Sequence, residues 1–340
     1  MQGESGPVRE LQLGSAGPKI SRVGFGAWAL GGEGWAFSLG RQDDASSIAA
    51  IMRAVDRGVS WIDTAAVYGC GHSEEVVGKA LALIPRAERP LIFTKCGLVC
   101  STTDPTFSPA RDLRPATMRR EVEESLRRLG VERIDLYQLH WPDRTGTPVE
   151  ETWGEMVRLI EEGKVAHAGV SNFGLDLLER IEPIRHVDSL QPPFSMIERG
   201  AAELLPWARE HGTGVIVYSP MQSGLLGGTH TRAALGRLDA GDWRRRDEHH
   251  QEPNLGRNLD LVRRLEPLAR ELGASLAELA VAWTLAWPGV TGAIVGARSP
   301  EQVEGWVNSA QLDLGRVEMD AIADAIEASG AGSGPPRPPA

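Results

Sequence analysis

The sequence predicts an α/β protein with the (β/α)8 architecture of a TIM barrel. Short apolar runs that end in polar or glycine residues alternate with amphipathic stretches of helical period, as in a parallel sheet built from strand and helix units. Eight such runs are present, which suits a closed barrel better than an open doubly wound sheet. No glycine fingerprint of the dinucleotide-binding type follows any of them, and this also argues against the open sheet.

The expected elements can be placed in order along the chain. Residues 10–13 and 19–20, joined through Gly17 and Pro18, are expected to form an N-terminal β-hairpin. The eight expected barrel strands are residues 22–26, 59–63, 91–95, 134–140, 165–171, 188–191, 214–219 and 292–296.

The clearest helix between these strands is Pro115–Leu129. Met118, Val122 and Leu126 line one of its faces, and charged residues fill most of the rest. Pro115 and the following Gly130 are residue types that commonly begin and end a helix. This segment therefore supports the alternation of strands and helices on which the barrel prediction depends.

Two segments depart from the regular spacing. Residues 219–257, between the seventh strand and its helix, are much longer than a usual connection, and such loops are either functional lids or disordered. After a short C-terminal helix, residues 330–340 are rich in glycine and proline and are expected to be a disordered tail, as are residues 1–7. One barrel domain is therefore predicted for residues 8–329.

The composition is that of a globular chain with an acidic balance. Of its 340 residues 41% are hydrophobic, and the net charge of -10 argues against nucleic acid as the main partner. No apolar segment is long enough to span a bilayer, and the N-terminus lacks the pattern of a targeting signal. We therefore expect a cytoplasmic protein without a membrane partner, whose oligomeric state leaves no trace in the sequence.

The cysteines and the paired histidines indicate no metal. Cys70, Cys96 and Cys100 are odd in number and lack metal-type spacing, so reduced thiols are expected rather than a disulfide framework. Cys70, close to a tyrosine discussed below, can be interpreted as a redox-sensitive thiol or, more simply, as a passive small residue. The adjacent His249 and His250 lie in a charged loop and are expected to be solvated.

Four polar side chains fall at or just past the ends of three consecutive expected strands. They are Asp63, Tyr68, Lys95 and His140. In a β/α barrel the C-terminal strand ends form one rim, and the active site lies there. Each residue alone has a structural interpretation, such as a turn cap, a surface cation or a buried polar group. Their convergence on one rim favours a catalytic role.

These four side chains can perform proton transfer without a metal. Lys95 would favour the phenolate form of Tyr68, and Asp63 would keep the ammonium protonated. His140 could donate a hydrogen bond to a carbonyl oxygen.

A second cluster follows the eighth expected strand. Loops after strands seven and eight commonly bind phosphate in barrels, because free N–H groups at a helix N-terminus favour an anion. Gly296 ends the strand, and Arg298 would add a charge able to bind phosphate in two places. A structural interpretation exists as well, since Ser299 can cap the next helix and Gln302 can complete a capping box.

Three stretches carry a resemblance to a known family. The first is residues 61–65 leading to Tyr68 and residues 71–74, the second is Thr94 with Lys95, and the third is residues 125–143. Their order and spacing resemble the two signatures and the catalytic lysine of the aldo-keto reductases. The resemblance extends over residues 8–314 and implies that Asp63, Tyr68, Lys95 and His140 are the catalytic residues.

The resemblance also implies a nicotinamide site and a substrate pocket. Ser171, Asn172 and Gln191 resemble the groups that bind the nicotinamide carboxamide. The remaining cofactor-binding residues it implies are Tyr218, Ser219, Pro220, Ser223, Gly224, Leu225, Gly296, Arg298 and Gln302. Trp28 and Trp141 would line the substrate pocket.

The implied reaction is hydride transfer between a nicotinamide cofactor and an aldehyde, ketone or sugar, in either direction, with Tyr68 as the proton donor. NADPH is the preferred cofactor because of Arg298, and NAD is possible. The chain departs from the family pattern at Gly305 and Trp306, where many members have glutamate and asparagine. An adenine or phosphate contact is therefore expected to differ here.

Two alternatives remain open at this point. Family members that resemble the β subunits of voltage-gated potassium channels bind NADP(H) and act as partners or redox sensors with little turnover. A lyase or isomerase could instead use Lys95 as a Schiff base, but it would leave Asp63, Tyr68 and His140 without a role.

Overall fold

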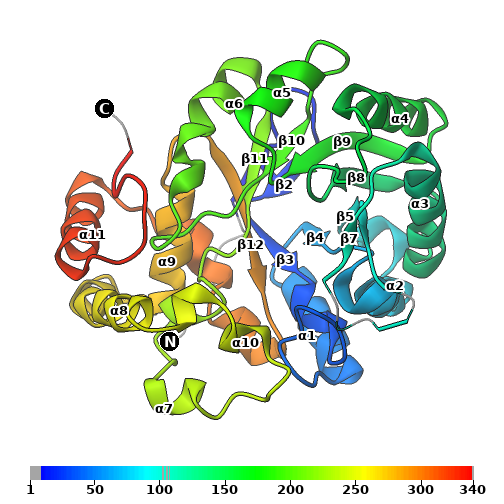
Figure 1. The fold of residues 1–340 in the computed structure, drawn as a ribbon. Helices are drawn as coiled ribbons and strands as arrows, with labels where there is room; N and C mark the ends of the chain where they lie inside the picture. Colours follow the sequence, from blue (N-terminus) through cyan, green and yellow to red (C-terminus); the bar gives the residue numbers. More distant parts are fainter. Residues whose placement is uncertain (1–8, 102, 105, 107, 339–340) are drawn as a thin grey trace.

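The fold is given by a computed structural model, which describes residues 9–338 except 102, 105 and 107 (Figure 1). Eight parallel strands form a closed barrel and confirm the predicted architecture. The barrel strands are β3 (Val23–Gly26), β4 (Trp61–Asp63), β5 (Leu91–Cys96), β8 (Ile134–Leu139), β9 (Val165–Ser171), β10 (Ser189–Gln191), β11 (Gly214–Val217) and β12 (Val290–Gly296). Each pairs with the next, and β12 closes on β3. The predicted residues 1–7 and the first residue of the predicted domain lie outside the described residues.

Helices surround the strands (Figure 1). They are α1 (Asp44–Asp56), α2 (His72–Leu83), α3 (Pro115–Leu129), α4 (Val149–Glu161), α5 (Leu175–Ile181), α6 (Leu205–His211), α7 (Arg232–Leu235), α8 (Asn254–Glu271), α9 (Leu276–Leu285), α10 (Pro300–Glu304) and α11 (Arg316–Ser329). The predicted helix at α3 has the expected bounds, and Gly130 ends it in the left-handed conformation, φ 65°. In the described part of the chain, no helix combines the length and apolar character needed to cross a membrane.

The predicted N-terminal hairpin fills one end of the barrel. Its strands, β1 (Glu10–Gln12) and β2 (Lys19–Ser21), are antiparallel. Leu13 and Ile20 are fully buried and pack with Trp61 and Phe93 inside the barrel. A Cβ atom on Gly214, the first residue of β11, would lie 2.4 Å from Leu13 Cδ1, so glycine is needed for this close approach. The hairpin therefore closes the N-terminal end, opposite the rim that bears the four polar side chains.

The long segment after β11 folds into short helices and packs on the segment after β3. Besides α7 it contains the 3-10 helices η5 (Leu225–Gly227), η6 (Trp243–Arg245) and η7 (Glu248–His250). The backbone N–H of Trp243 donates to the Ser38 carbonyl at 3.0 Å, and the Arg246 guanidinium donates to the Ala36 carbonyl at 2.8 Å. These contacts hold the segment against the residues that follow β3.

The C-terminal segment, for which the sequence predicts disorder, is described as far as residue 338. Ser333 exchanges backbone hydrogen bonds with Ile197 and Arg199. The Arg199 side chain, only 4% exposed, donates to the carbonyls of Ala331 and Gly334. The C-terminal segment makes these contacts through its backbone groups. Its glycine- and proline-rich composition therefore did not indicate that it would be ordered.

The remaining short elements connect the barrel units. They are the antiparallel pair β6 (Leu98–Val99) and β7 (Ala110–Arg111) and the 3-10 helices η1 (Trp28–Gly31), η2 (Tyr68–Gly71), η3 (Arg86–Glu88), η4 (Gly200–Glu203) and η8 (Val307–Gln311).

Candidate active site

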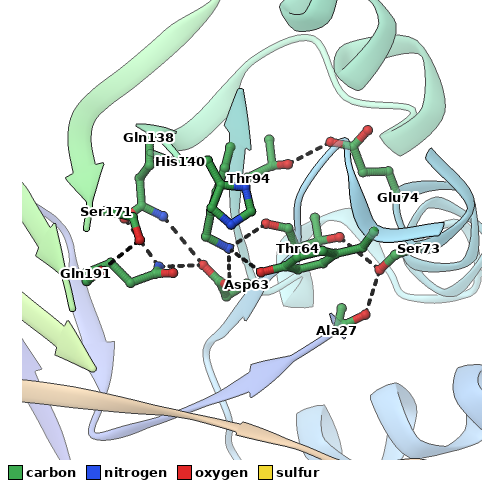
Figure 2. A network of polar contacts seen from close by, with 12 residues as sticks. Ala27, Asp63, Thr64, Ser73, Glu74, Thr94, Gln138, His140, Ser171 and Gln191 are labelled. Carbon is green, nitrogen blue, oxygen red and sulfur yellow. Dashed lines mark hydrogen bonds and ion pairs between the residues drawn. The ribbon is translucent and has the colours of Figure 1, made fainter. Parts of the chain in front are cut away.

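The four polar residues predicted to converge do lie together at the C-terminal rim. Figure 2 shows two of them, Asp63 and His140, among their neighbours. Asp63 is the last residue of β4, Lys95 lies near the end of β5, and His140 follows β8. Lys95 Nζ donates to Asp63 Oδ1 at 2.5 Å and to the Thr64 carbonyl at 2.9 Å. It also lies 3.2 Å from Tyr68 Oη. The ammonium therefore links the carboxylate to the phenol.

The turn that presents Tyr68 depends on a close backbone approach. Gly69 adopts φ 60°, and a Cβ atom there would lie 2.2 Å from the Gly31 carbonyl oxygen. The turn η2 therefore packs directly on η1, the segment after β3. This contact holds the tyrosine at the rim, although the residue lies well beyond the end of β4.

A disulfide joins Cys70 in this turn to Cys100 after β6, with their Cα atoms 5.8 Å apart. The prediction of reduced thiols is therefore wrong for both residues, and so is the interpretation of Cys70 as a passive small residue. Cys96 is a buried free cysteine. A count of three cysteines is compatible with one pair and one free thiol, and the fold alone brings together two residues that are 30 positions apart.

His140 is held as a neutral imidazole. Its carbonyl accepts a hydrogen bond from Asn172 Nδ2 at 2.9 Å, and its ring centroid lies 5.7 Å from that of Tyr68. Burial lowers the pKa of His140 well below its ordinary value, and the positive charges of Lys95 and Arg111 lower it further. Within the described chain the buried Nδ1 atom has no hydrogen-bond partner. A nitrogen is thus left for a group from outside the protein.

The pKa of Tyr68 is shifted upward in this structure. Burial is the largest cause, the Lys95 ammonium acts in the opposite direction, and the Asp63 carboxylate raises the pKa again. Lys95 therefore favours the phenolate as expected, but burial outweighs its charge. At neutral pH the phenol holds its proton and is able to donate it.

Three of the residues predicted to bind the carboxamide form one hydrogen-bonded group with Tyr218. The Ser171 hydroxyl donates to the Gln191 carbonyl at 2.8 Å, and Asn172 Nδ2 donates to the same hydroxyl at 3.0 Å. The Tyr218 hydroxyl donates to Asn172 Oδ1 at 2.8 Å. Asn172 adopts the left-handed backbone conformation, φ 62°, which is uncommon outside glycine and often marks a functional site.

The predicted pyrophosphate loop has an unusual backbone. Ser219, Ser223 and Gly224 all have positive φ, at 56°, 52° and 95°. Pro220 lies between them, and Leu225 begins η5 with its side chain buried. Turns of this kind can direct several N–H groups toward an anion, and strained residues persist where the surrounding structure holds them.

Arg298 lies where the sequence predicts, but its side chain is already engaged. Its guanidinium donates to Gln42 Oε1 at 2.7 Å and to the carbonyls of Leu39 and Arg41. Gly296, which ends β12, is exposed. The capping box is wrong in detail: the Ser299 side chain makes no cap hydrogen bond, and Gln302 Oε1 accepts from the Arg298 N–H at 2.8 Å.

Tryptophans lie on both sides of the rim. The Trp28 ring lies 5.3 Å from the Trp243 ring, and the Arg111 guanidinium lies 4.1 Å from the centre of the Trp141 ring. Trp35, 4% exposed, lies 6.0 Å from the Tyr68 ring. Trp243 was missed by the sequence interpretation because it comes from the long loop, whose path the chain pattern does not predict.

Residues that could hold a metal do not gather anywhere in the described chain. Gln138, another residue missed from the sequence, lies on β8 directly beside this site. Its signal was available: it is polar, and it occupies the same strand face as Leu136, which points into the barrel.

Comparison with known proteins identifies the family. The family model for the "Aldo/keto reductase family" matches residues 22–327. The chain belongs to the aldo/keto reductase family.

Three relatives in this family match over nearly their whole length. The "Aldo-keto reductase YhdN" of Bacillus subtilis is 36% identical over 92% of this chain and 95% of its own. The "NADH-specific methylglyoxal reductase" of Escherichia coli is 34% identical over 94% of this chain and 100% of its own. Among solved structures, the glycerol dehydrogenase AKR11B4 from Gluconobacter oxydans superposes with a TM-score of 0.85 at 37% identity, covering 97% of this chain and 99% of that one. The chain is therefore an oxidoreductase of this family.

Proposed function

We propose that this chain reduces an aldehyde or ketone, or oxidises the corresponding alcohol, with NAD(P)H and with Tyr68 as the proton donor. The observation that supports this most directly is the Tyr68 hydroxyl, 3.2 Å from the Lys95 ammonium and beside the His140 ring. A protonated phenol at this position can deliver its proton to a carbonyl oxygen at the rim.

The protein side of the reaction consists of positioning and electrostatics. The carbonyl oxygen of the substrate would accept a hydrogen bond from Tyr68 and another from the neutral imidazole of His140. As the oxygen gains negative charge, the Tyr68 proton moves to it, and the Lys95 ammonium stabilises the phenolate that remains. Asp63 keeps Lys95 protonated, because the nearby carboxylate raises the pKa of the ammonium although burial lowers it.

The residues present fit a nicotinamide cofactor. Ser171, Asn172 and Gln191 would hold its carboxamide, and the Tyr218 ring would stack on the nicotinamide. When bound, the reduced nicotinamide supplies hydride to the carbonyl carbon. No donor to Gln191 Oε1 is present among the described residues, and the Nδ1 atom of His140 also lacks a partner. Polar atoms left unpaired at a rim of this kind are suited to an incoming ligand.

The choice between NADPH and NADH depends in this proposal on Arg298. We propose a preference for NADPH, which requires the guanidinium to leave Gln42 and contact the 2′-phosphate. The Escherichia coli relative is named as NADH-specific, so NADH is the alternative for this chain. Comparing the two cofactors directly therefore tests this part of the proposal.

The substrate class proposed is a small carbonyl compound or sugar. Two of the relatives named above are a methylglyoxal reductase and a glycerol dehydrogenase, and both named substrates are small and uncharged. Trp28 and Trp141 would offer aromatic surfaces to such a substrate. A cytoplasmic location is also part of the proposal, and fractionation of cells that express the protein tests it.

The decisive experiment measures NADPH and NADH oxidation with methylglyoxal, glyceraldehyde and an aromatic aldehyde, in the wild type and in Tyr68→Phe. We expect Tyr68→Phe to bind cofactor as before and to lose turnover by roughly 100-fold or more, because the proton donor is absent. Unchanged turnover in Tyr68→Phe would refute the proposal. Tight cofactor binding without turnover in the wild type would favour the cofactor-sensing alternative.

A further inference from the structure

Two glutamine side chains, Gln138 and Gln191, contact the buried carboxylate of Asp63 (Figure 2), at the oxygen that Lys95 does not hold. Gln191 Nε2 donates to Asp63 Oδ2 at 2.8 Å, and Gln138 Nε2 lies 3.5 Å from the same oxygen. Lys95 holds the other oxygen, Oδ1. Both carboxylate oxygens are therefore bound, one by an ammonium and one by two amides.

The two amides are also bound to each other. Gln191 Nε2 lies 3.3 Å from Gln138 Oε1, so its two hydrogens point to Asp63 and to Gln138. This fixes the orientation of the Gln191 amide and leaves its Oε1 atom as an acceptor. The same Gln191 amide therefore contacts Asp63 through Nε2 and would contact the cofactor carboxamide through Oε1.

The neighbouring strands of the barrel leave room for the Gln138 side chain. It is fully buried and is paired in register with Lys95 across β5 and β8. On its other side it faces Gly169 of β9, where a Cβ atom would lie 3.1 Å from Gln138 Cγ. A larger residue in place of Gly169 would crowd the amide. Asp63, Lys95 and Gln138 come from three neighbouring strands of the barrel, β4, β5 and β8.

We infer that Gln138 is a positioning residue, which acts together with Gln191 on Asp63. In this role it keeps Lys95 and Tyr68 arranged for proton donation. Through Gln191 it also couples these two residues to the carboxamide site. Burial raises the pKa of Asp63, and hydrogen bonds from Lys95, Gln191 and Gln138 oppose this shift. Without the hydrogen bond from the Gln138 amide, the negative charge of Asp63 is less well compensated and acts more strongly on Tyr68. The Asp63 carboxylate also competes more strongly for the Lys95 proton. Both effects disfavour the Tyr68 phenolate, so the pKa of Tyr68 rises.

Four charged or titratable groups among the described residues interact with Tyr68. Lys95 and Asp63 come from neighbouring strands, His140 lies beside its ring, and Tyr218 follows β11. The Gln138 amide carries no charge itself, so its removal changes how these groups interact without adding a new ionisable group.

This inference rests on the proposed role of Tyr68, and the experiment separates the two. Tyrosine labelled with 13C at Cζ gives few signals because the chain has three tyrosines, and Tyr68→Phe identifies the signal of Tyr68. In Gln138→Met, which is close in volume and lacks the amide, we expect the Tyr68 titration to move upward by about one unit. We expect kcat to fall about tenfold, while the cofactor Kd measured by tryptophan fluorescence changes less than about twofold.

Thr94→Val is the matched control. Thr94 is equally buried on the strand that bears Lys95, but its hydroxyl donates to Glu74 at 2.6 Å and has no contact with Asp63. We expect this variant to lose stability and to keep the Tyr68 titration of the wild type. The same titration shift in both variants would overturn the inference, as would no shift in Gln138→Met.

Gln138→Glu provides a second variant in case the methionine variant does not fold. A protonated glutamic acid can still donate to Asp63, whereas its carboxylate repels it. We therefore expect kcat of Gln138→Glu to increase as the pH falls, which no loss of packing would produce. A pH profile parallel to that of the wild type would count against Gln138. If Tyr68→Phe itself remains active, it is the proposed function that fails.

Discussion

The ammonium of Lys95 lies 2.5 Å from the carboxylate of Asp63, and both side chains are almost completely buried, at 1% and 2% exposure. A buried ion pair of this kind adds little to stability compared with apolar residues, but the loss of one partner leaves an uncompensated charge inside the barrel. The pair is therefore better explained by chemistry than by stability.

This relationship predicts the behaviour of Lys95→Met. We expect turnover to be lost and the free energy of unfolding to fall by roughly 3 to 5 kcal/mol, because Asp63 is left buried without its cation. The double variant Asp63→Asn with Lys95→Met removes both charges and should recover much of the stability without recovering turnover. Urea unfolding and cofactor oxidation assays measure the two effects separately. Equal stability of the single and double variants would contradict this explanation.

The pKa shifts predict a broad pH range for reduction. His140 has a pKa well below its ordinary value of about 6.5, and the pKa of Tyr68 lies above its ordinary value of about 10. The active form has a neutral imidazole and a protonated phenol, so it persists between these limits. We expect kcat for reduction to be flat from about pH 6.5 to 10. A kcat profile with a midpoint near neutral pH would contradict the protonation states assigned to His140 and Tyr68, provided that product release does not limit turnover.

Arg298→Ala tests cofactor preference. If the guanidinium binds the 2′-phosphate, its loss should weaken NADPH by roughly tenfold or more and NADH much less. Gln42→Leu is the matched control, because it removes the Gln42 contact and keeps the cation. Isothermal titration with both cofactors gives the Kd of each variant relative to the wild type, for NADPH and for NADH. An equal effect of Arg298→Ala on the two cofactors would show that this arginine is structural.

Glu121 predicts a pH-dependent stability. This carboxyl group of α3 accepts a hydrogen bond from the Gly97 N–H at 2.8 Å, and burial raises its pKa to about 7. Its folded pKa exceeds its unfolded one, so its contribution is complete below about pH 4.5 and is lost as the pH rises through 7. Glu121→Gln keeps an acceptor and cannot ionise.

We therefore expect Glu121→Gln to match the wild type near pH 5 and to be more stable at pH 8, by as much as roughly 3 kcal/mol. Thermal unfolding at the two pH values measures the difference, and the pH 5 value serves as the internal control. A constant offset between the variant and the wild type at both pH values would mean that Glu121 does not titrate in this range.

The Cys70 and Cys100 disulfide predicts a redox-dependent stability. It closes a segment with a sequence separation of 30, so reduction should lower the free energy of unfolding by roughly 3 to 4 kcal/mol. Denatured wild type should show one reactive thiol, Cys96, before reduction and three after it. Dithiothreitol should leave the stability of Cys100→Ser unchanged. Three reactive thiols without reductant would contradict the pairing.

Much of the fold was predictable because its signals are local. The eight strands and the bounds of α3 follow from apolar periodicity and from helix-ending residues such as Gly130, which depend on neighbours a few positions away. The path of the long segment after β11, the contacts of Arg199 with the C-terminal segment and the disulfide were not predictable. Each joins residues far apart in sequence through backbone groups or through a geometry that no short pattern encodes.

The sequence by itself determined the barrel and the meeting of Asp63, Tyr68, Lys95 and His140 at one rim, because strand ends in a parallel barrel must share one rim. Only the tertiary structure decided what each side chain does there. It placed Gln138 and Gln191 on Asp63, held Arg298 on the segment after β3, and gave His140 a neutral ring. These properties depend on distance and burial, which arise only when strands far apart in the chain pack together.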